Sequence, residues 1–206
     1  TELNVRALDL LGECLTNIVE KTRALCDGTV CADFVSNIDQ DLEFDGGIAE
    51  NTGITEENVL KNYEIMGKAL GFDVKKAVLS HQTHTNIVLP VDATHHGVGL
   101  FGPELPECDG LVTNEPGTAL VIFTADCTPL LFHDPVTGAV GAAHAGWRGT
   151  VALIAKNTID VMVNKFGSNP KDILCGVGPN ISVCCYEVDD PVINEVKKLS
   201  FLDFDR

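Results

Sequence analysis

The chain has 206 residues, 45% of them hydrophobic, which is enough for one substantial core, so we expect a single domain over residues 1–206. The formal net charge of −16 and the pI of about 4.5 describe an acidic surface that repels phosphate groups, which argues against nucleic acid and membrane partners. No apolar run approaches the roughly eighteen residues of a membrane helix and no secretory leader is evident, so we expect a cytoplasmic protein.

Two amphipathic helices are predicted in the first third of the chain. Within residues 1–25 apolar residues recur at the spacing of one helical face, with Thr1 as a possible cap. Residues 26–52 are acidic and have no clear period, so we expect them to be irregular. Thr55 is placed to cap a second helix, which has one apolar face and ends before Gly71.

From Ala77 onward the pattern changes to short apolar runs separated by turn residues, which is typical of strands. The predicted strands cover residues 77–80, 86–89, 110–113, 118–124, 129–133, 139–144 and 173–177. A third helix is predicted from Thr150 to the residue before Gly167. We therefore expect a mixed α/β (α+β) fold with a mixed β-sheet core flanked by helices.

The loop over residues 91–106 is long and polar enough to form a rim or lid. The chain ends at Arg206 without a capping pattern, which is consistent with a truncated C-terminal part. The sequence carries no indication of oligomeric state.

The cysteines indicate a reducing compartment. The chain contains Cys14, Cys26, Cys31, Cys108, Cys127, Cys175, Cys184 and Cys185. No pair has the C-x-x-C spacing, which argues against a zinc knuckle, and we expect reduced thiols, most of them buried.

Three polar segments follow or interrupt the predicted strands. Residues 80–85 follow an apolar run, and residues 123–129 place an acid, a thiol and a proline between two apolar strands. Residues 143–150 end a strand, turn on glycines on either side of Trp147 and start a helix whose N–H groups can hold an anion. Polar side chains at strand ends lie at the rim of a sheet, where a functional site can form.

The three segments supply a candidate metal site at His84, Cys127 and His144. One thiolate and two imidazoles suit zinc, and three protein ligands leave a fourth position open, as in catalytic zinc sites. The 17 residues between Cys127 and His144 fit two strands joined by a turn at 134–138, which returns both ligands to one end of the sheet. Taken singly, His84 is better explained as a surface or hydrogen-bonded histidine, and Cys127 as an inert buried thiol. Rival imidazoles are provided by His81, His95, His96 and His133.

Longer motifs carry a resemblance to a known family. They are QTHT at 82–85, TADCTP at 124–129 and HAGWRGT at 144–150, with flanking pieces at 108–114, 176–181 and 185–188. Their order and separation resemble the laccase-domain family, also called the multicopper polyphenol oxidase or YfiH/YlmD-like family. The resemblance covers residues 55–190 and implies a YfiH-like fold.

The resemblance also implies an activity, because characterised members of the family are zinc purine nucleoside phosphorylases. It implies zinc, with copper as the less favoured metal, on His84, Cys127 and His144, with Asp126 and Arg148 as catalytic residues and Gln82, Gly146, Trp147 and Gly149 at the substrate. The implied substrates are adenosine, inosine, guanosine and methylthioadenosine together with phosphate, and adenosine deamination is implied as a further activity.

Three different functions also fit these residues. One is a metal-independent cysteine hydrolase with Cys127 as nucleophile and His144 as base. The second is a copper polyphenol oxidase, which this ligand set supports poorly because it lacks the blue-copper pattern of histidines, cysteine and axial methionine. The third is a non-catalytic zinc-binding module. It is suggested by Glu64, which stands where family members commonly have an arginine that helps to hold phosphate.

Overall fold

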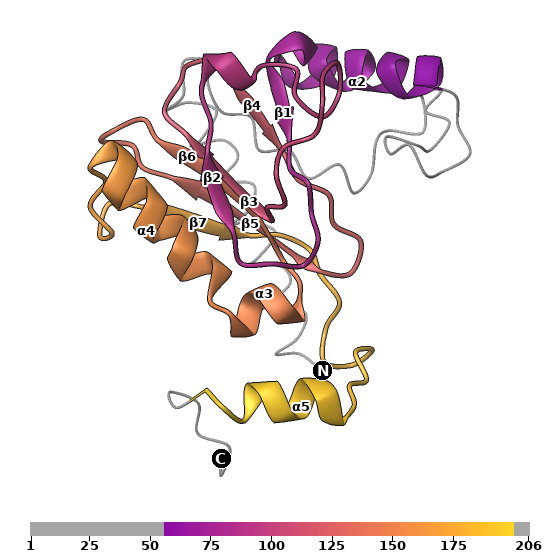
Figure 1. Ribbon diagram of the computed structural model, residues 1–206, viewed down its shortest axis with the longest axis vertical. Helices are drawn as coiled ribbons and strands as arrows, with labels where there is room; N and C mark the ends of the chain where they lie inside the picture. The colour runs from indigo at the N-terminus through magenta and orange to yellow at the C-terminus, as the bar shows by residue number, and fades with distance from the viewer. Residues whose placement is uncertain (1–55, 200–206) are drawn as a thin grey trace, which may run out of the picture.

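The computed structural model describes residues 56–199 of the chain (Figure 1). The predicted helix over 1–25, the irregular segment over 26–52 and the cap at Thr55 lie outside the described residues. The described part is a mixed α/β structure, as predicted. None of its helices is both long and apolar enough to cross a membrane.

The helices and strands follow one another in mixed order. They are α2 (Glu56–Leu70), β1 (Ala77–Leu79), β2 (Val88–Pro90), β3 (Gly110–Thr113), β4 (Ala119–Val121), β5 (Thr128–His133), β6 (Val140–Ala145), α3 (Trp147–Val151), α4 (Ile154–Phe166), β7 (Leu174–Val177) and α5 (Asp190–Val196). There are also two short 3-10 helices, η2 (Val74–Lys76) and η3 (Ala93–His95).

A five-stranded mixed sheet forms the centre of the structure, with the strand order β2-β3-β6-β5-β7. Only β2 and β3 are parallel, and the other neighbours are antiparallel. Strands β5 and β6 form the predicted hairpin, whose turn is held by the carboxylate of Asp134, which accepts the N–H of Val136 at 2.9 Å and the hydroxyl of Thr137 at 2.6 Å. The hairpin register places Pro129 opposite His144.

Helices cover this sheet and a second, two-stranded parallel sheet formed by β1 and β4. Helix α4 lies along one face of the larger sheet, where Ile154 and Met162 pack with Val112 and Phe132 (Figure 1). Complete burial of such side chains contributes about 1.5–3 kcal/mol each. Helix α2 buries Tyr63 against β1 of the smaller sheet. Helix α4 therefore covers one face of the larger sheet, and the ends of the strands remain available to form a site.

Two features differ from the sequence-based expectation of one helix between residues 150 and 167. The structure has a short α3, which starts at Trp147, and a separate α4. Between them Leu153 adopts a left-handed conformation with φ of 63°. The break leaves the Ala152 carbonyl without its helical partner, and the side-chain amide of Asn86 donates to it at 2.9 Å. Apolar periodicity continues through such a break and does not reveal it.

Two further expectations are wrong for the described residues. The run at 118–124 forms only the three-residue β4, because the side-chain amide of Gln82 occupies the backbone N–H and carbonyl of Phe123, which a longer strand would use for pairing. Most cysteines were expected to be buried, but of the five described ones only Cys108 is buried. Cys175, Cys184 and Cys185 are exposed. Helix α5 was not expected.

Candidate metal centre

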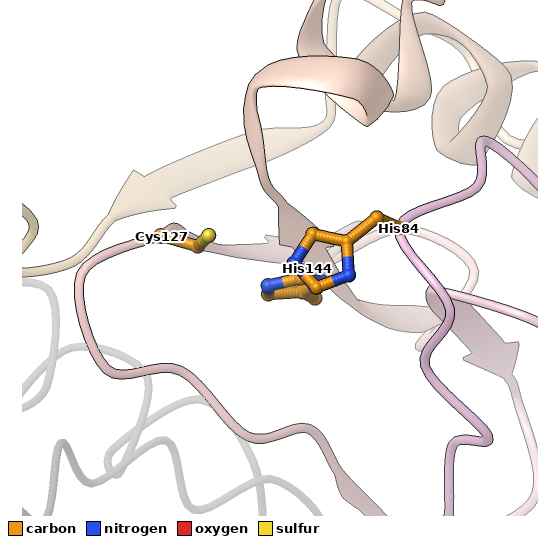
Figure 2. Close-up of side chains that lie close together, drawn as sticks. All are labelled: His84, Cys127 and His144. Carbon is orange, nitrogen blue, oxygen red and sulfur yellow. The ribbon is translucent and has the colours of Figure 1, made fainter.

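The three predicted ligands come together at one end of the larger sheet. His84 lies in the segment after β1, Cys127 lies just before β5, and His144 belongs to β6. Their ligand atoms all lie within 4.8 Å of one another, and Figure 2 shows the three side chains pointing toward a common point. The two imidazole rings meet edge to face with centroids 4.9 Å apart. His144 is buried, Cys127 is half-buried and His84 is exposed.

His84 is held by an unusual backbone conformation. Its φ of 64° lies in the left-handed region, which costs a residue with a side chain about 1–2 kcal/mol. The cost is offset by Asp109, whose carboxylate accepts the N–H groups of Thr83, His84 and Thr85 at 3.1, 3.0 and 2.7 Å. It also accepts the hydroxyl of Thr85 at 3.0 Å. One carboxylate therefore holds the whole turn that presents His84.

Asp109 is also the partner of the second histidine. It is completely buried, and its Oδ2 lies 3.1 Å from Nδ1 of His144. Burial raises the pKa of the Asp109 carboxyl, but the hydrogen bonds from Thr85, His144 and Thr83 outweigh burial and hold the pKa below its usual range. The carboxylate is therefore charged at neutral pH. Sequence reasoning missed Asp109 as a site residue, although a lone acid directly before the buried strand β3 was a signal.

Gly146 leaves room for the three ligands. A Cβ at this position would lie 2.9 Å from Cδ2 of His84, 3.3 Å from Sγ of Cys127 and 3.5 Å from Cε1 of His144. Any side chain here would enter the space that the ligands enclose. The absence of a side chain at Gly146 thus fits a metal ion held among the three residues.

The donor set and its spacing fit a single zinc ion. Zinc bonds of about 2.0–2.3 Å in a tetrahedral arrangement place ligand atoms about 3.5 Å apart. The ligand atoms, which all lie within 4.8 Å of one another, are therefore at most about 1 Å farther apart than around a bound ion, and His84 is exposed. The structure shows a group that could hold a metal, and its chemistry favours zinc.

The thiol of Cys127 is better suited to a metal than to metal-free catalysis. Burial raises its pKa, and the negative charges of Asp126 and Asp109 raise the pKa further. A thiol with a raised pKa is protonated at neutral pH and is a weak nucleophile. A bound cation removes this obstacle, because it deprotonates a coordinating thiol.

The predicted catalytic residues are neighbours of the ligands in the sequence, since Asp126 precedes Cys127 and Arg148 lies four residues after His144. Asp126 is exposed, and its backbone carbonyl accepts the N–H of Ile181 at 2.9 Å. Arg148 is exposed and places its guanidinium carbon 4.4 Å from the ring centroid of Trp147. A carboxylate and a cation are therefore close to the ligands along the chain, Asp126 before β5 and Arg148 in α3, and their catalytic roles stay predictions.

The remaining predicted substrate residues have structural contacts of their own. The Gln82 amide donates to the Phe123 carbonyl and accepts its N–H, both at 2.7 Å. A Cβ at Gly149 would lie 2.9 Å from the carbonyl oxygen of Thr85, so glycine allows α3 to approach the His84 turn. Their roles in substrate binding stay predictions. The rival imidazoles of His81, His95, His96 and His133 are not part of the ligand group found among residues 56–199.

Comparison with known proteins agrees with this geometry. A family model described as multi-copper polyphenol oxidoreductase laccase matches residues 45–203. The chain belongs to this family.

Among the family's curated proteins, "Purine nucleoside phosphorylase YlmD" of Bacillus subtilis is 39% identical over 166 residues, which cover 75% of this chain and 60% of that protein. Hypothetical protein YfiH of Bacillus licheniformis superposes with a TM-score of 0.70 at 37% identity, covering 74% of this chain and 58% of that one. YlmD of Geobacillus stearothermophilus gives 0.69 at 34% identity, covering 73% and 57%. The chain thus spans about 60% of the length of the curated relative.

The family's description names a multi-copper oxidase, but the described residues contain one possible metal group. That group has two imidazoles and one thiol and could hold one metal ion.

Gly146→Ala tests whether the ligands enclose a metal. The φ of −66° at Gly146 tolerates alanine, so the cost comes from the new Cβ against His84 and Cys127. Overpacking of this kind costs about 1–3 kcal/mol, so we expect zinc affinity to fall roughly 10- to 100-fold, measured by competition with a chromophoric chelator. Gly102→Ala is the matched control, since its Cβ would meet nothing closer than 3.9 Å. Equal affinity in both variants would contradict the enclosed site.

Proposed function

We propose that this chain is a zinc-dependent purine nucleoside phosphorylase acting on adenosine, inosine, guanosine and methylthioadenosine. One observation carries the proposal: the ligand atoms of His84, Cys127 and His144 lie within 4.8 Å of one another, in a chain that is 39% identical to a protein named as a purine nucleoside phosphorylase. Two imidazoles and a thiol support zinc over copper. When bound, zinc would supply an electrophile or an activated water at its open position.

The steps of phosphorolysis can be assigned to individual residues that are close to the ligands in the sequence. Phosphorolysis breaks the bond between C1′ of the ribose and a purine nitrogen, and a phosphate oxygen forms the new bond to C1′. The electron pair leaves with the purine, which takes up a proton. Following the family resemblance, we assign transfer of that proton to Asp126 and binding of the phosphate to Arg148, both of which are exposed. The face of the Trp147 ring that the guanidinium of Arg148 does not cover would offer an apolar surface to the purine.

A second candidate activity is adenosine deamination, which uses water in place of phosphate. Glu64 favours it, because this exposed residue of α2 stands where the family commonly has an arginine for phosphate. Deamination releases ammonia and leaves inosine, so the two activities are distinguished by their products.

A product screen tests the proposal. Each nucleoside is incubated with zinc-loaded protein, with and without phosphate, and base, ribose 1-phosphate and ammonia are measured by chromatography and enzymatic assay. We expect base to appear only with phosphate, and a chelator to abolish its release until zinc is restored. If the zinc-loaded protein releases neither base nor ammonia from any of the four, the proposal fails and a non-catalytic zinc module takes its place.

The same samples distinguish a zinc phosphorylase from a thiol hydrolase and from a copper oxidase. A thiol hydrolase using Cys127 and His144 would keep its activity in the presence of the chelator. A copper oxidase would consume oxygen with a phenol after copper loading and would show no activity with zinc. Either result, without phosphate-dependent base release, would overturn the proposed function.

A further inference from the structure

We infer that Asp109 is the positioning residue of the metal centre, a single buried carboxylate that sets both the backbone conformation of His84 and the ring tautomer of His144. The inference rests on the proposed metal centre, and its test reads zinc binding and tautomer rather than turnover of a nucleoside.

The two oxygens of Asp109 have different partners. Oδ1 accepts the N–H groups of Thr83 and Thr85 and the hydroxyl of Thr85. Oδ2 accepts the N–H of His84 at 3.0 Å and lies 3.1 Å from Nδ1 of His144. One oxygen thus holds the turn, and the other touches the two histidine ligands directly.

The contact to His144 determines which ring nitrogen can bind a metal. A carboxylate can only accept hydrogen bonds, so Nδ1 of His144 must carry the ring proton. Nε2 is then left with its lone pair, which is the form that binds zinc. Metal-binding histidines in proteins commonly have a carboxylate partner of this kind, and losing the partner costs about 10- to 100-fold in metal affinity.

The contact to the His84 N–H determines where the second imidazole stands. The left-handed conformation of His84 is unfavourable by itself and persists because three successive N–H groups converge on Asp109. The backbone of Asp109 ties this turn to the sheet, since its N–H donates to the carbonyl of Ile87 at 3.0 Å and its carbonyl accepts the N–H of His144 at 2.7 Å. Both histidines are therefore positioned by one residue.

Asp109→Asn tests the inference with almost no change in size. The amide oxygen replaces Oδ1, where three donors converge, so the NH₂ group replaces Oδ2 and faces the His84 N–H and Nδ1 of His144. His144 then has to accept at Nδ1 and carry its proton on Nε2, and His84 loses its acceptor. We expect zinc affinity to fall about 10- to 100-fold in a chelator competition.

Asp134→Asn is the matched control. Asp134 is also completely buried and also holds a turn through its carboxylate, but it lies at the other end of the β5–β6 hairpin. We expect this variant to lose resistance to urea and to keep the zinc affinity of the unchanged chain. If both variants lose zinc affinity equally, or neither loses it, Asp109 has no specific role at the metal.

Nitrogen NMR of the metal-free chain gives a readout that does not depend on whether Asp109→Asn folds. In the unchanged chain we expect His144 to show a protonated Nδ1 and an unprotonated Nε2, and the opposite pattern in Asp109→Asn. A protonated Nε2 in the unchanged chain would overturn the inference. If the NMR and zinc-affinity results are as expected but the nucleoside screen finds no activity, the proposed function is wrong and the role of Asp109 at the metal is retained.

Discussion

Cys127→Ala is expected to lose zinc binding and nucleoside phosphorolysis together. The substitution removes one of the three ligands, and the remaining imidazoles of His84 and His144 do not hold the ion in an open site. Loss of a direct ligand has a larger effect than loss of its hydrogen-bond partner, so we expect zinc affinity to fall more than about 100-fold. Zinc content after gel filtration and the rate of base release measure the two effects.

A second cysteine provides the control for this variant. Cys175 lies on β7 and is exposed, so Cys175→Ala removes a thiol without touching the ligand group. We expect full zinc content and full activity from it. Retention of both properties by Cys127→Ala would refute the metal centre. A zinc-bound Cys127→Ala protein that is inactive would instead indicate that Cys127 is a nucleophile.

His144→Ala is expected to reduce both zinc binding and stability. His144 is only 4% exposed, and its removal takes away a ligand and leaves Oδ2 of the buried Asp109 with one fewer partner. Losing a hydrogen bond to a buried charged group costs about 1.5–3 kcal/mol. We expect the free energy of unfolding of the metal-free chain to fall by about this amount in urea, and the zinc affinity to fall more than about 100-fold.

Removal of another buried imidazole separates the two effects. His133 lies at the far end of β5 and is 8% exposed. His133→Ala should lower stability, because it opens space in the sheet, and should leave zinc affinity unchanged. A normal zinc affinity in His144→Ala would exclude His144 as a ligand, whatever happens to its stability.

The ligands themselves could be predicted from the sequence because their signal is local. Cys127 interrupts two apolar runs, His84 follows a third, and the turn at 134–138 requires that the strands before and after it run side by side. A hairpin of known length brings residues at its open end together whatever else the chain does. The convergence of Cys127 with His144 was therefore predictable, as was the mixed α/β class.

Local patterns failed where a distant residue decides the conformation. The strand predicted at 118–124 is cut short by Gln82, and the helix predicted after Thr150 is broken where Asn86 takes the Ala152 carbonyl. Each of these partners is tens of residues away along the chain, so no window of sequence contains both. Hydrophobic periodicity reports which face is buried and does not report which side chain captures a backbone group.

Asp109 is the clearest case of what the tertiary structure decided. The sequence determined the chemical types of the three ligands, and hence which metal they favour. It did not reveal that one acid holds both histidines, because its partners lie 24–26 residues away at the His84 turn and 35 residues away at His144. Ligand identity is a property of single residues, whereas ligand orientation depends on hydrogen bonds that form only when β3, β6 and the His84 turn are packed together.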